Sequence, residues 1–76
     1  MTNTNLQLEM HDLIVQFIAN DDVRDQIIEL SSLNEDQTMD IVWRTAHEYN
    51  ALIESSDDAD DTELDAIIDY AVTRLI

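Results

Sequence analysis

Apolar residues recur every three or four positions along most of this chain, the spacing that gathers side chains on one face of an α-helix. Four stretches carry the pattern, and short polar or acidic segments separate them. Amphipathic helices joined by short links bury their apolar faces against one another. The sequence therefore predicts an all-α fold, a compact bundle of four short amphipathic helices at about residues 5–19, 22–31, 35–54 and 62–76.

The first predicted helix is apolar around most of its girth. Its main stripe consists of Leu6, Met10, Leu13, Ile14, Phe17 and Ile18. A second line, at a different angle, consists of Leu8, Val15 and Ala19. A helix of this kind is central in a bundle, or its second line contacts a partner or a second copy of the chain. Both a monomer and a homodimer are therefore open.

Capping residues predict where the other helices begin. Asp21 or Asp22 is placed to cap the second helix, and Asn34 the third. Thr62 with Asp65 has the spacing of a capping box for the fourth. The predicted stripe of the third helix consists of Thr38, Ile41, Val42, Thr45, Ala46, Tyr49, Leu52 and Ile53.

The composition bounds the class of protein. Residues 1–76 are enough for one acidic helical domain, and 45% of them are hydrophobic, which is enough for a core. Glycine and proline are both absent, which disfavours tight hairpin turns and favours helices. No apolar run approaches the roughly 20 residues of a membrane span, and the first residues lack the basic start of a signal peptide. A cytoplasmic protein is the expectation.

Charge is the outlying feature of the composition. Eighteen acidic residues face three arginines, lysine is absent, and the formal net charge is −15. Such a field repels nucleic acid and anionic membranes and attracts basic surfaces. The plainer interpretation is a solvated surface that keeps the protein soluble. However, soluble surfaces generally intersperse both signs of charge, so the absence of lysine favours a use for the field.

No catalytic, cofactor or metal site is predicted. Asp58, Asp60 and Thr62 match the first ligand positions of a calcium loop, but Glu63 stands where the sharp turn needs glycine. The chain has no cysteine for disulfides or thiolate zinc sites. His11 and His47 each precede an acidic residue, but no nucleophile motif or glycine-rich loop accompanies them. We therefore expect a protein that is not an enzyme.

The densest acidic segment is 57–69, with seven carboxylates in thirteen residues and no positive charge. On a helix, the spacing of Asp58, Asp61, Asp65 and Asp69 aligns them on one face. The third predicted helix extends the negative surface. The acids predicted to contact a partner are Glu48, Glu54, Asp57, Asp58, Asp60, Asp61, Asp65 and Asp69.

Trp43, the sole tryptophan, lies off the centre of the third helix's stripe. A flanking aromatic of this kind is either half-buried packing or an interface anchor, because tryptophan is enriched at binding hot spots. It is therefore the one apolar residue among the predicted partner contacts.

In size, helicity and charge the chain resembles small acidic phage-encoded inhibitors, the anti-restriction and anti-CRISPR proteins that mimic nucleic acid. The resemblance implies reversible, non-catalytic binding to the lysine- and arginine-lined groove of a DNA- or RNA-binding protein in a bacterial host cell, with no direct binding to nucleic acid. Two alternatives remain. One is an antitoxin-like or adaptor module that docks through Trp43 or the line Leu8, Val15 and Ala19, and the other is an acidic domain adapted to high salt.

Overall fold

The computed structural model describes residues 2–20, 22–55, 58 and 60–76, and this part of the chain forms four α-helices. They are α1 (Thr2–Ala19), α2 (Arg24–Leu30), α3 (Glu35–Ser55) and α4 (Asp61–Leu75). The predicted all-α four-helix bundle is confirmed. The predicted bounds lie close to the observed ones, with the largest difference at the start of α1.

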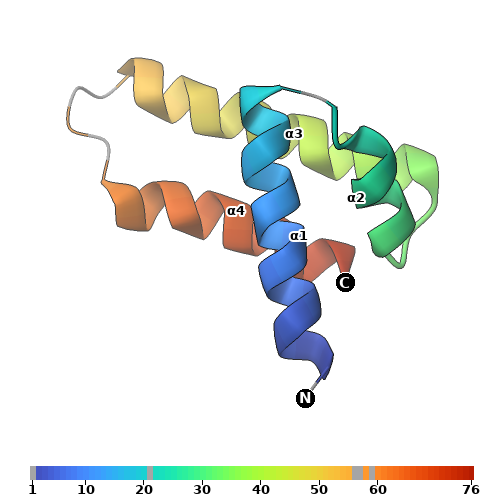
Figure 1. Ribbon diagram of the computed structural model, residues 1–76. Helices are drawn as coiled ribbons and strands as arrows, with labels where there is room; N and C mark the ends of the chain where they lie inside the picture. The colour runs from blue at the N-terminus through green and yellow to red at the C-terminus, as the bar shows by residue number, and fades with distance from the viewer. Residues whose placement is uncertain (1, 21, 56–57, 59) are drawn as a thin grey trace.

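Helices α3 and α4 run antiparallel, and α1 crosses the pair, as Figure 1 shows. The short α2 packs against α1 and α3, and α1 contacts each of the other three helices. The radius of gyration is 12.1 Å, close to the roughly 11 Å expected for a compact domain of this length. Because α1 contacts three other helices, it has apolar residues on more than one face, which explains part of its apolar pattern.

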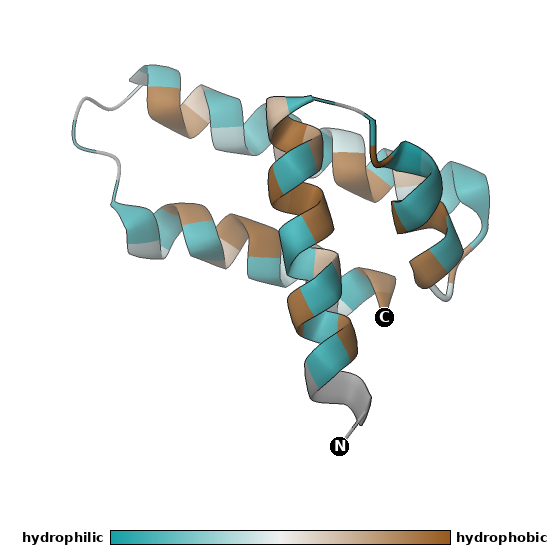
Figure 2. Cartoon of the chain, viewed as in Figure 1, coloured by the Kyte–Doolittle hydropathy of each residue, from teal (hydrophilic) through white to brown (hydrophobic). Residues whose placement is uncertain are grey.

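The core lies between α1 and the α3–α4 pair, and α2 closes one end of it. Every helix contributes, and Figure 2 shows hydrophobic positions recurring along each of them. The buried apolar residues are Met10, Ile14, Phe17, Val23, Ile27, Met39, Val42, Ala46, Ile68, Ala71, Val72 and Leu75.

Two positions on α3 differ from the predicted stripe. Ile53 was placed on the stripe but is exposed, because the last turns of α3 extend beyond the crossing of α1 (Figure 1). Met39, outside the predicted stripe, is buried instead. Periodicity identifies the buried face of a helix, but the neighbouring helices decide how far along it the burial extends.

The link between α2 and α3 is tied to the end of α4. The backbone N–H of Ser32 donates to the carbonyl of Leu75 at 2.9 Å, and the Ser32 hydroxyl donates to the same oxygen at 3.2 Å. The hydroxyl of Ser31 lies 2.6 Å from that of Thr38, which is fully buried. These bonds satisfy polar groups that would otherwise be costly to bury.

The helix caps agree with the predictions only in part. Asn34 caps α3, because its side chain accepts from the backbone N–H of Gln37 at 2.8 Å. The capping box on Thr62 was wrong: Asp60 caps α4 and accepts from the Thr62 N–H at 3.1 Å. Asp22 does not cap α2, whose N-cap Val23 has no side-chain cap bond. Asp21 lies outside the described residues.

Two properties of the described residues match the composition. None has a positive backbone φ angle, so this part of the fold needs no glycine. None of the helices here is long and apolar enough to cross a membrane.

Candidate functional site

The acidic segment divides into a connector and a helical row. Asp58 precedes α4 and so does not share a helix face with the later acids, contrary to the sequence expectation. Asp60, the N-cap of α4, is exposed, and one of its carboxylate oxygens accepts the capping hydrogen bond. Asp57 lies outside the described residues.

Asp61, Asp65 and Asp69 form the acidic row of α4. All three are exposed, and the side chains of Asp65 and Asp69 retain 66% and 70% of their accessible surface. Residues four apart are neighbours on a helix and rise about 6 Å per step. The row therefore presents three carboxylates at regular intervals along one side of α4.

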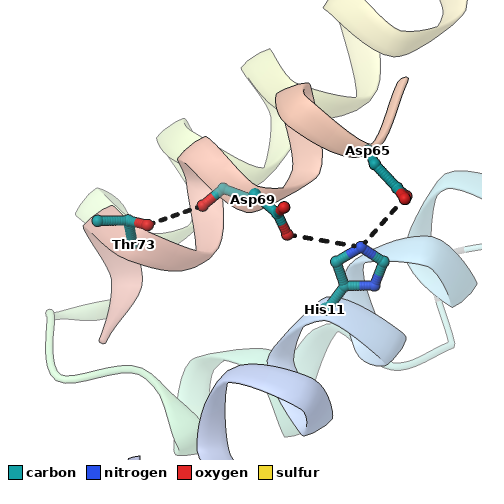
Figure 3. Close-up of polar contacts among 4 residues, drawn as sticks. All are labelled: His11, Asp65, Asp69 and Thr73. Carbon is teal, nitrogen blue, oxygen red and sulfur yellow. Dashed lines mark hydrogen bonds and ion pairs between the residues drawn. The ribbon is translucent and has the colours of Figure 1, made fainter. Parts of the chain in front are cut away.

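His11 of α1 points at this row, as Figure 3 shows. Its Nε2 lies 3.5 Å from Oδ1 of Asp65 and 3.7 Å from Oδ1 of Asp69. These distances are too long for a good hydrogen bond, so the contact is weak. The partners of His11 thus lie on another helix, whereas its sequence neighbour Asp12 contacts Gln16 at 3.4 Å.

The three arginines lie away from the acidic row. Arg24 pairs with Glu35 at 3.1 Å, and Arg44 with Asp40 at 3.4 Å. Arg74 donates to the hydroxyl of Tyr70 at 2.8 Å, and its guanidinium carbon lies 5.2 Å from the centre of that ring. Among the described residues, no arginine is within ion-pairing distance of Asp61, Asp65 or Asp69.

The two predicted glutamates are exposed on α3 but do not extend this row. Glu48 lines a hollow with Tyr70 and Arg74, on a different side of α4 from Asp65 and Asp69. Glu54 is near the C-terminal end of α3, one residue before the last residue of that helix. The structure therefore brings together Asp61, Asp65 and Asp69 but leaves Glu48 on a separate surface.

Trp43 is both packed and exposed. Its ring meets the buried ring of Phe17 edge to face, with centroids 5.0 Å apart and an interplanar angle of 79°. It nevertheless remains 55% exposed and borders a hollow of about 530 Å³ along α3 with Arg44, His47 and Asn50. The residue combines the two roles that the sequence left open.

These surfaces carry carboxylates and one exposed aromatic ring. No group of three or more histidine, aspartate or glutamate side chains in the described residues is arranged to hold a metal ion. The carboxylates accept hydrogen bonds and attract cations, and Trp43 offers an apolar contact.

Comparisons with protein-family models, with curated proteins and with solved structures give no match.

Proposed function

We propose that this protein is a non-enzymatic acidic binding protein that mimics nucleic acid. It blocks the basic DNA- or RNA-binding groove of a target protein, in the manner of anti-CRISPR or anti-restriction inhibitors in a bacterial cytoplasm. The observation that supports the proposal is the exposed row Asp61, Asp65 and Asp69. Among the described residues, its only basic neighbour within 4 Å is the partly buried His11.

The spacing of the row is compatible with this role. Successive carboxylates rise about 6 Å along α4, the same order as the separation of charges along one strand of nucleic acid. The net charge of −15 adds long-range attraction toward a basic groove. Association is therefore fast and electrostatically steered, and the affinity falls as salt screens the charges.

The energetics also support a use for the row. Like charges four residues apart on a helix destabilise it by about 0.2–0.5 kcal/mol per pair. Asp61, Asp65 and Asp69 carry two such pairs and, among the described residues, lie beyond ion-pairing distance of any arginine, whereas Asp40 pairs with Arg44 and Glu35 with Arg24. A surface that serves solubility alone does not require this arrangement.

A matched pair of variants tests the proposal. In the row variant, Asp61→Asn, Asp65→Asn and Asp69→Asn remove three charges from α4. The control variant Glu9→Gln, Asp25→Asn and Glu29→Gln removes three exposed charges from α1 and α2, and Asp25, like Asp61, is in the first turn of its helix. The two variants therefore have equal net charge and differ in where charge is lost.

Each protein is immobilised and exposed to a bacterial lysate at low and high salt, and captured proteins are identified by mass spectrometry. Wild type and the control are expected to capture nucleic-acid-binding proteins at low salt, and the row variant is expected to lose them. Equal capture by the row variant would contradict the proposal.

A second candidate function is a protein–protein interaction module that docks through an apolar face. The observation that favours it is Trp43, which remains 55% exposed although its ring packs on Phe17. In that case Trp43→Ala, not the row variant, abolishes capture.

A further inference from the structure

An exposed apolar line runs along α1, and its Leu8 end lies beside Asp69 of the acidic row. Leu8 is 65% exposed and Val15 42% exposed, and seven residues, or about two helical turns, separate them. The core residues Met10, Ile14 and Phe17 leave the same helix in other directions and are buried. The second line of α1 is therefore not used by the core of the described chain.

The acidic row meets this line at Leu8. A hollow of about 340 Å³ is lined by Gln7, Leu8, His11, Asp69, Val72 and Thr73. Its apolar wall comes from Leu8 on α1 and Val72 on α4, and its carboxylate from Asp69. Asp65 is the next carboxylate along α4, on the other side of the His11 ring (Figure 3). Leu8 and the acids Asp65 and Asp69 thus belong to one continuous surface.

Charge decides which occupant fits. A second copy of the chain brings another net charge of −15 and the same acids, so pairing of this face with itself is electrostatically unfavourable. Asp12, exposed on α1 between Leu8 and Val15, adds a further negative charge to the face. The complementary surface is basic.

The apolar component adds to this description. Surfaces that bind single-stranded nucleic acid interleave basic side chains with aromatic ones, on which bases stack. A mimic that offered only carboxylates would leave such aromatic side chains in water. An exposed Leu8 next to Asp69 supplies the apolar contact that a base supplies next to its phosphates.

We infer that Leu8, Val15 and the acidic row form one docking surface for a basic protein segment in which an apolar or aromatic side chain stands beside arginine or lysine. The partner's apolar side chain packs on Leu8 at the hollow, and its cationic groups meet Asp65 and Asp69. This inference rests on the proposed function and specifies the chemistry of the partner.

Synthetic helical peptides test the inference with purified protein. The probe carries leucine and arginine on adjoining faces, and a second peptide has serine in place of every leucine with the same charge. The protein variants are Leu8→Ser with Val15→Ser, the row change Asp65→Asn with Asp69→Asn, and Tyr70→Ser. Tyr70 is a matched control because it is 64% exposed but borders the α3 side of α4. Circular dichroism verifies that each variant is helical, and Leu8→Met is the conservative replacement.

The leucine–arginine peptide is expected to bind wild type and to shift the amide NMR signals of Leu8, His11 and Asp69. The protein variant Leu8→Ser with Val15→Ser binds this peptide about tenfold more weakly, as expected for losing one buried aliphatic contact. Its affinity for the serine peptide is unchanged, because that peptide makes no apolar contact for the variant to lose. Tyr70→Ser and Leu8→Met retain wild-type affinity.

Three results overturn the inference. The first is that the double variant Leu8→Ser with Val15→Ser binds the leucine–arginine peptide as tightly as wild type does. Another is no binding of that peptide at millimolar concentration. The third is that wild type sediments as a dimer whereas the double variant Leu8→Ser with Val15→Ser sediments as a monomer. In each case the nucleic-acid-mimic proposal stands if the row variant still loses its captured partners, so the two failures are distinguishable.

Discussion

The two sides of α4 carry different kinds of surface. On the side facing α1, Asp65 and Asp69 are exposed, and in the part of the chain that the structure describes their only basic neighbour within 4 Å is the imidazole of His11. On the side facing α3, Tyr70 and Arg74 border a hollow that also contains Arg44 and acidic residues, so both signs of charge are present. The comparison shows that the net charge is unevenly distributed, and that one helix separates a mixed surface from an acidic one.

The largest expected effect is on partner affinity. Reversing the charge of the acidic side with Asp65→Lys and Asp69→Lys is expected to weaken binding of the captured partner at least about a hundredfold, because each change replaces attraction with repulsion. Titration calorimetry with that partner measures the change.

The mixed side provides the control for this experiment. Asp40→Lys with Glu48→Lys makes the same change in net charge on α3 and is expected to weaken binding less than about threefold at physiological salt, where charges beyond the Debye length are screened. Equal losses in the two variants would mean that net charge alone drives binding, and that the distinction between the two sides of α4 has no functional meaning.

A smaller effect is expected at the start of α4. Asp60→Ala removes the cap of the helix that carries the acidic row and is expected to lower the free energy of unfolding by about 1 kcal/mol. Thr62→Ala is the control and is expected to cost less than about 0.5 kcal/mol, because its side chain makes no cap bond. Urea denaturation followed by circular dichroism measures both. A larger loss for Thr62→Ala would restore the capping box predicted from the sequence.

The smallest expected effect is on the stability of the row itself. Asp65→Asn with Asp69→Asn is expected to change the free energy of unfolding by no more than a few tenths of a kcal/mol, because repulsion along α4 is small and the contacts with His11 are long and partly exposed. The same variant is expected to lose partner binding. A loss of more than about 1 kcal/mol in urea would indicate that these acids are there to hold α1 on α4.

The helices were predictable because they depend on local pattern. Apolar spacing and the cap residue Asn34 are properties of adjacent residues, and they gave bounds close to those of α3. The exposure of Ile53 was not predictable, because it depends on where α1 crosses α3. The residues responsible lie far away in the sequence.

In the candidate site, too, some features follow from local sequence and others from the packing of distant helices. That Asp61, Asp65 and Asp69 share a face follows from the helical repeat. His11 contacts Asp65 and Asp69 because of how α1 packs on α4. The residues next to His11 in the sequence do not indicate this packing. The exposure of Leu8 and Val15 likewise appears only when the core is seen to be complete without them. The sequence does mark them as a second apolar line, and the structure identifies the acidic surface beside that line.

Competition with nucleic acid is the decisive measurement for the mimic. The immobilised protein is loaded with its captured partner at low salt and then washed with excess single-stranded or duplex nucleic acid. The proposal puts the acidic row in the groove that also binds nucleic acid, so nucleic acid is expected to displace the partner in a concentration-dependent way. If saturating nucleic acid leaves the partner bound, the two do not share a site, and the protein is not a nucleic-acid mimic.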